Sequence, residues 1–166
     1  MTDKTSRRSV LKNAIQGIAA VGAVAGAPSG AHAAPAEGRI AGFDHVAFPL
    51  GDLEKMTTFY RALGCDVVVS TGVVKVYIGS NMINFHRPET WQNKAFTLRA
   101  PAALPPCGDL CFVWEGSPES IKALLDRVGA KVEVGPVQRD GGRRKNASSV
   151  YVRDPDGNLL EFMIYP

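Results

Sequence analysis

One acidic residue near the end of the chain stands in an otherwise apolar segment. Residues 158–164 read Asn-Leu-Leu-Glu-Phe-Met-Ile, a pattern typical of a buried β-strand. Alternate side chains of a strand face opposite sides, so Glu161 shares its face with Leu159 and Met163. A carboxylate there carries a large desolvation cost unless a cation or several hydrogen-bond donors meet it. On composition alone, an exposed place at a sheet edge or an ion pair with Arg153 explains Glu161 better than a bound metal ion.

Three other residues of types that ligate metals fall in predicted strands. His45 lies in an apolar run that ends at Leu50, His86 ends another run, and Asp109 opens a third. Asn84 is two positions from His86 and therefore shares its strand face. Imidazole and carboxylate groups ligate divalent ions. A lone strand histidine is nevertheless more often a core or surface residue, and Asp109 also suits a turn at the start of a strand.

The elements that must position these residues follow one order twice. The first copy, residues 41–86, reads as a strand, a helix and three further strands. Its helix has apolar residues at helical spacing, with Asp52 as N-cap and Gly64 as its stop. The expected segments are a strand at 44–50, a helix at 52–63 and strands at 66–71, 73–78 and 82–86.

The second copy, residues 108–166, follows a Pro-rich connector, residues 87–107. Its helix opens with Ser117 as N-cap and Pro118 as first residue, and Gly129 ends it. The expected strands are 109–114, 131–134, 148–153 and 158–164, with the last hairpin turn at 154–157.

Corresponding positions of the two copies are 65 residues apart, as Gly64 and Gly129 or Asp44 and Asp109 show. Either copy alone is too small to bury a core. We therefore predict an α+β fold of two tandem βαβββ modules, which form a curved mixed sheet around a cleft with the helices outside. The alternative is an α+β sandwich without duplication, which the equal spacing disfavours.

The positive charge of the 166-residue chain is concentrated at its N-terminus. The net charge is +3, but the first 33 residues hold four basic residues and one acidic residue, and the remainder holds 15 of each. A phosphate-binding domain needs surplus Lys and Arg on its folded body. A nucleic-acid partner is therefore not expected.

The N-terminus has the order of an export signal. Arg7 and Arg8 precede an Ala- and Gly-rich apolar stretch, residues 14–27, and a small-x-small site ends at Ala33. The stretch is shorter than the roughly 20 apolar residues that cross a bilayer. It resembles the bacterial twin-arginine signal, which implies a signal peptide at 1–33, a linker at 34–40, a periplasmic or secreted protein, and no stable membrane anchor after cleavage. A retained signal anchor or a cytoplasmic protein with a basic tail is the alternative.

The three cysteines lie in the body of the chain, at Cys65, Cys107 and Cys111. An odd number cannot form a complete disulfide set. Cys111 falls in an apolar strand pattern, which predicts a small buried residue.

Several motifs resemble the vicinal oxygen chelate superfamily, which contains glyoxalase I, extradiol dioxygenases and the fosfomycin and bleomycin resistance proteins. They are Phe43-Asp44-His45-Val46, Phe59-Tyr60, Leu63-Gly64 and, above all, Asp154-Pro155-Asp156-Gly157-Asn158-Leu159-Leu160-Glu161. The resemblance covers residues 41–166. Ile83-Asn84-Phe85-His86, Gly108-Asp109-Leu110-Cys111 and Gly135-Pro136-Val137 with Arg139 are similar to the glyoxalase-domain-containing 5 and virulence-protein branch.

The resemblance implies a site for a divalent ion (Fe, Zn, Ni or Mn). Glu161 and His45 stand at the last and first ligand positions of the family. Asp109 replaces the histidine of many metal-binding members, and Asn84 aligns with a family glutamate. His86 is the better ligand chemically, so either residue takes the fourth position. The implied set is His45, His86, Asp109 and Glu161.

Other residues are candidates for binding a small-molecule substrate. Tyr151 and Arg153 lie on a predicted strand, Trp91 lies in the connector, and Arg139 begins a Gly-containing basic loop at 139–146. Such a loop can hold an anionic substrate, although a solvated hairpin loop is the plainer interpretation.

The resemblance implies an exported metal-dependent enzyme that chelates a small oxygen-bearing substrate, either a lyase or isomerase with Glu161 as base, or an extradiol-type dioxygenase. The alternative is a metal-free protein that sequesters a small molecule, as bleomycin-resistance relatives do, and Asn84 and Asp109 favour it. A homodimer built by pairing of modules is also open.

Overall fold

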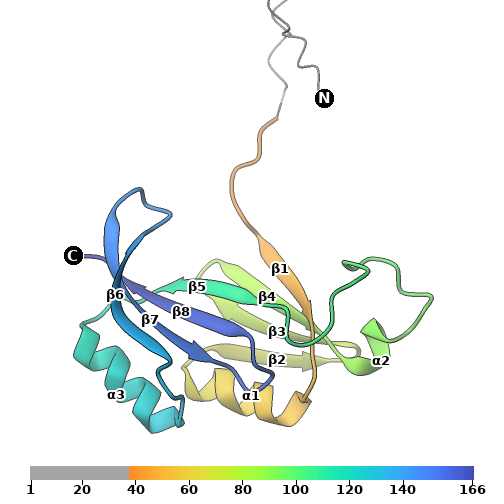
Figure 1. Ribbon diagram of the computed structural model, residues 1–166. Helices are drawn as coiled ribbons and strands as arrows, with labels where there is room; N and C mark the ends of the chain where they lie inside the picture. The colour runs from red at the N-terminus through yellow and green to blue at the C-terminus, as the bar shows by residue number, and fades with distance from the viewer. Residues whose placement is uncertain (1–37) are drawn as a thin grey trace, which may run out of the picture. The chain divides into compact units, whose positions relative to one another are not determined.

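The computed structural model of the protein describes residues 38–166. The predicted signal peptide at 1–33 and most of the predicted linker lie outside the described residues. Within 38–166, no helix combines the length and the apolar character needed to cross a membrane. Residues 41–166 contain two sheets of four strands each (Figure 1).

The first module contains one helix and one sheet. Its strand order is β1-β4-β3-β2, with β1 parallel to β4 and the other pairs antiparallel. Its elements are β1 (His45–Pro49), α1 (Leu53–Ala62), β2 (Asp66–Ser70), β3 (Val73–Ile78) and β4 (Asn81–His86).

The second module repeats this arrangement after the connector. Its order is β5-β8-β7-β6, again with the first strand parallel to the last. Its elements are β5 (Asp109–Val113), α3 (Pro118–Val128), β6 (Val134–Asp140), β7 (Asn146–Arg153) and β8 (Leu159–Ile164). The predicted α+β fold of two βαβββ modules is confirmed.

Both long helices begin at the predicted N-caps, and α3 ends at the predicted Gly129, whereas the C-cap of α1 is Leu63, one residue before the predicted stop Gly64. The Asp52 side chain accepts from Lys55 N at 3.0 Å to cap α1, and Ser117 caps α3 ahead of Pro118. Gly129 follows α3 with φ at 72°, a left-handed conformation that glycine adopts without steric cost. The helices lie on the same side of the two sheets (Figure 1). This leaves the opposite side of the sheets free of long helices.

One hydrophobic core extends through both modules. In the first module it contains Tyr60 of α1 and Phe85 of β4, whose rings lie 5.4 Å apart. In the second it contains Leu125 of α3 and Phe162 of β8. Fully burying one such side chain stabilises the fold by about 1.5–3 kcal/mol. Because the modules share this core, they fold as one body.

A polar network at the β7–β8 turn also joins the modules. The Asp156 carboxylate accepts from the backbone N–H groups of Gly51 and Asp52 at 2.7 and 2.9 Å. The buried Tyr60 hydroxyl donates to Asp154 Oδ2 at 3.1 Å, and Asn158 donates twice to Asp154. Burial raises the pKa of Asp154 above its ordinary value, despite these three donors.

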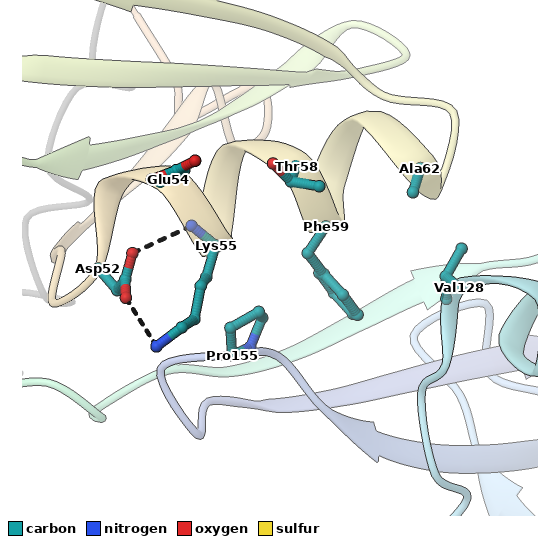
Figure 2. A pocket seen from close by; sticks show the side chains of 8 residues that line it. All are labelled: Asp52, Glu54, Lys55, Thr58, Phe59, Ala62, Val128 and Pro155. Carbon is teal, nitrogen blue, oxygen red and sulfur yellow. Dashed lines mark hydrogen bonds and ion pairs between the residues drawn. The ribbon is translucent and has the colours of Figure 1, made fainter.

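A shallow hollow lies beside this network on the helix side. Figure 2 shows Phe59 of α1 pointing between Pro155 of the β7–β8 turn and Val128 at the end of α3, while Lys55 pairs with Asp52. None of the predicted site residues lines it.

One expectation about an individual element is wrong, because the strand predicted at 131–134 is β6, at Val134–Asp140. The connector, for which no element was predicted, contains a short helix, α2 (Pro88–Trp91). Pro136 argues against a strand, but β6 is an edge strand with a register shift between Val134 and Val137, and an edge tolerates a missing N–H. The basic loop between β6 and β7 is consequently shortened to residues 141–145.

Candidate functional site

Each sheet turns one face to the core and carries polar side chains on the other. In the first sheet, the β1–β4 register places His45, Asn84 and His86 on this second face. In the second sheet, the registers place Asp109, Cys111, Glu161, Tyr151 and Arg153 there. We call these the polar faces of the two sheets. The strand alternation predicted from the sequence therefore distributes the site residues over two faces, one in each module.

Glu161 lies in the middle of the second sheet, because β8 runs between β5 and β7. Its Oε1 atom is buried and has no hydrogen-bond partner among residues 38–166. Arg153 pairs with Glu133 at 3.0 Å and donates to the Gly157 carbonyl. Both plainer explanations of Glu161, a sheet edge and an ion pair with Arg153, are therefore wrong. A buried acceptor without a donor costs about 1–3 kcal/mol, which a bound cation would offset.

The neighbours of Glu161 across the sheet are Cys111 on β5 and Tyr151 on β7. Cys111 is exposed on the polar face, contrary to its predicted burial, because β5 is the edge strand of its sheet. Partial burial of the sulfur, followed by the charge of Glu161, raises the pKa of the Cys111 thiol to about 12. The Tyr151 hydroxyl accepts from Arg139 Nε at 3.1 Å, and the guanidinium lies 5.7 Å from the ring centroid. These two contacts hold the Arg139 guanidinium against Tyr151.

His45 is half exposed and oriented by its neighbour. Its Nδ1 lies 2.6 Å from Asp44 Oδ1. A neutral imidazole that donates from Nδ1 keeps the Nε2 lone pair free, which is how ligating histidines are commonly held. A hollow that we call the β1–β5 hollow contains His45 from the first module together with Cys111 and Arg143 from the second. His45 and the edge of the second sheet thus border one hollow, although Glu161 does not line it.

His86 and Trp91 meet in a different hollow, formed where the connector covers the first sheet. We call it the connector hollow, and it is lined by Ala47, His86, Trp91, Arg99, Ala100 and Ala103, among others. The His86 ring packs edge-on against Phe96, with centroids 5.0 Å apart. Desolvation, followed by the charge of Arg99, lowers the pKa of His86 below its ordinary value. Both effects favour the neutral imidazole.

The last two candidates differ in burial. Asn84 is half-buried, and its Oδ1 atom has no hydrogen-bond partner among residues 38–166. Asp109 is exposed at the start of β5. Asn158 fixes the chain just before it, since its Oδ1 accepts from Cys107 N and Gly108 N at 3.0 and 2.8 Å. The turn position considered for Asp109 is consistent with this arrangement.

The donor set matches a divalent ion in part. Glu161 has a buried oxygen, Oε1, without a hydrogen-bond partner among residues 38–166. The Asp44 carboxylate holds Nδ1 of His45, which leaves Nε2 as the nitrogen that could bind an ion. Across residues 38–166, however, no three His, Cys, Asp or Glu side chains come close enough together to hold an ion. Glu161 and His45 therefore fit as ligands by their individual environments, while His86 lies in the connector hollow and Asp109 is exposed.

Comparison with known proteins identifies the family. Residues 42–162 match the Glyoxalase/Bleomycin resistance protein/Dioxygenase superfamily, and the chain belongs to this superfamily. It is 37% identical over 123 residues to the glyoxalase domain-containing protein RDO1 of Mycosarcoma maydis, covering 74% of this chain and 67% of that protein. It is 32% identical over 124 residues to virulence protein STM3117 of Salmonella typhimurium, covering 74% and 83%.

Solved structures support the same assignment. An integron cassette protein from the mobile metagenome of V. cholerae has a TM-score of 0.68 at 30% identity, over 77% of this chain and 98% of that chain. A lactoylglutathione lyase from Agrobacterium tumefaciens has a TM-score of 0.58 at 22% identity, over 75% and 94%. The second comparison shows the shared fold alone.

Arg99, the guanidinium of the connector hollow, escaped the sequence analysis, and its isolation within the Pro- and Ala-rich segment 95–106 is the signal that could have found it. Arg143, which lines the β1–β5 hollow, belongs to the basic loop considered for anion binding. Cys111, expected as a small buried residue, borders Glu161 instead.

Proposed function

We propose that this protein is an exported, divalent-metal-dependent enzyme of the superfamily, which acts on a small oxygen-bearing substrate by lyase or isomerase chemistry or as an extradiol-type dioxygenase. The observation that carries the proposal is the unpartnered, buried Oε1 of Glu161 in the middle of the second sheet. Cys111 and Tyr151 are weak partners of the Glu161 carboxylate from the neighbouring strands, and neither satisfies Oε1. A cation at this oxygen would offset its desolvation. Export rests on the resemblance of residues 1–33 to a twin-arginine signal.

Glu161 and His45 would hold the ion, with Asp109 and either His86 or Asn84 completing the proposed set. A divalent ion would supply Lewis-acid polarisation of two neighbouring substrate oxygens. Imidazole nitrogen and carboxylate oxygen together suit Fe, Zn, Ni or Mn better than calcium or magnesium, which prefer oxygen ligands alone.

The surrounding residues have separate tasks in this proposal. In the isomerase version, the Glu161 carboxylate accepts a proton from the substrate carbon and returns it to the neighbouring carbon. The Tyr151 hydroxyl accepts from Arg139 and interacts with Glu161 across the sheet, so in this proposal its proton turns from Glu161 to a substrate oxygen. Arg139 then supplies positive charge near the same oxygen.

A metal-free binding protein is the second candidate. It is favoured by the lack of any group of three metal-ligating side chains in the described part of the chain. In that case the polar faces would bind a small molecule by hydrogen bonds alone, with the free Oδ1 of Asn84 and the Tyr151 hydroxyl as natural partners.

Metal analysis separates the two candidates. Protein purified without added ions is analysed beside His45→Ala and Glu161→Ala, with Asp66→Ala as the control, because Asp66 is an exposed acid at the start of β2 that lines none of the three hollows. The enzyme proposal predicts about one ion per chain in the wild type and the control, and loss of the ion from both site variants. If the wild type is metal-free as purified and stays metal-free after incubation with each of the four ions, the enzyme proposal is refuted.

A further inference from the structure

The connector hollow contains a positive charge that no acidic side chain balances. Arg99 forms no ion pair with any residue of 38–166, although five other ion pairs occur there. Its guanidinium is half-buried and is held by neutral groups. Nη1 donates to the Trp91 carbonyl at 3.0 Å, Nη2 donates to the Pro101 and Ala103 carbonyls, and the Trp91 ring lies 5.8 Å away. These contacts fix the position of the cation without neutralising it.

One donor of this guanidinium is left unused. The Nε atom of Arg99 is buried and has no acceptor among the described residues. The buried Nε–H does not face the hollow, but it leaves the partly desolvated cation short of acceptors, so a negative charge beside the guanidinium is favourable.

The walls of the hollow add a second polar group and a rigid frame. His86 lines the hollow together with Arg99, and its imidazole carries at least one ring N–H whatever its protonation state. The Trp91 indole is fixed by a hydrogen bond of 2.8 Å from Nε1 to the Leu50 carbonyl. The remaining walls include Ala47, Ala100 and Ala103, which leave a cavity of about 90 Å³.

We propose that the connector hollow is a binding site for a small carboxylate, with Arg99 as the cation and His86 as the neighbouring donor. The space accommodates a carboxylate group with little attached to it, such as acetate or the carboxylate end of a larger ligand. The hollow lies on the polar face of the first sheet, on which Asn84 also lies. The site goes beyond the proposed metal-dependent activity and does not depend on a metal ion.

The test follows the Trp91 indole N–H by two-dimensional ¹H–¹⁵N NMR. The full chain is stripped of metal, exchanged into chelator-free buffer and titrated with sodium acetate at constant ionic strength, with chloride replaced step by step. Acetamide, which has the same shape without the charge, is titrated in parallel. The wild type is expected to show saturable shifts with acetate and none with acetamide.

Two variants and a control assign the site. Arg99→Gln removes the charge, and Ala103→Leu fills the cavity while keeping the main-chain carbonyl that Arg99 uses. Both are expected to weaken acetate binding at least tenfold, whereas Lys94→Gln, which removes an exposed connector charge, leaves it unchanged. Ala103→Leu keeps the test valid if Arg99→Gln unfolds the connector. Linear shifts without saturation, equal binding of acetamide, or unchanged binding by a folded Ala103→Leu would each overturn the proposal, and the metal proposal would stand.

Discussion

Replacement of Glu161 by Met tests whether this carboxylate destabilises the metal-free protein. Met has a similar length and matches Leu159 and Met163, which share its face. The change removes a buried acceptor that has no partner within residues 38–166. Such an acceptor costs about 1–3 kcal/mol. We therefore expect Glu161→Met to raise the free energy of unfolding in EDTA by about that amount.

The assay is urea unfolding, followed by far-UV circular dichroism, in EDTA and with an excess of the bound ion. Metal binding adds about 2.7 kcal/mol when the free ion is at 100 times its Kd. The wild type should therefore equal or exceed the variant once the ion is present. Glu115→Met, at an exposed acid, should change stability by no more than about 0.5 kcal/mol in either condition. A Glu161→Met protein that is less stable than the wild type in EDTA would show that the carboxylate is already satisfied by the protein.

Three further predictions concern the module junction and the N-terminus. Tyr60→Phe should lower the free energy of unfolding by about 1.5–3 kcal/mol, since it removes a buried donor to the Asp154 carboxylate. An unchanged midpoint of urea unfolding would show that this hydrogen bond does not stabilise the fold. The folded-state pKa of Asp154 is raised, so its contribution to stability is full below the unfolded pKa of about 3.9 and falls as pH rises through the folded value. The unfolding free energy of the wild type relative to Asp154→Asn should consequently decline as the pH is raised from about 4, and a rising difference would contradict the shift. Replacing Arg7 and Arg8 with Lys should leave unprocessed protein in the cytoplasm on cell fractionation, and normal export of that variant would refute the signal assignment.

The fold was predictable because its local signals agree with one another. The caps at Asp52 and Ser117, the stops at Gly64 and Gly129 and the equal spacing of the two copies all depend on short stretches of chain. The prediction failed at β6, where Pro136 lies in an edge strand whose pairing with β7 is a long-range property.

The candidate site was less predictable, because strand alternation fixes the face of a side chain but not its surroundings. The position of Glu161 among apolar neighbours followed from the sequence, but its lack of an ion pair within residues 38–166 did not, because Arg153 pairs with Glu133 instead. The placement of His86 beside Arg99 depends on how the connector folds over the first sheet. The spacing of apolar residues in the connector does not indicate how it folds over the first sheet. The metal-ligand roles of the predicted residues stay predictions.

Anomalous diffraction from crystals grown with the bound ion tests the central claim most directly. At the absorption edge of that ion, we predict a single strong peak within roughly 2.0–2.2 Å of both Glu161 Oε1 and His45 Nε2. A peak that contacts neither side chain, or a fully ordered site with no peak, would contradict the claim that these two residues share a cation.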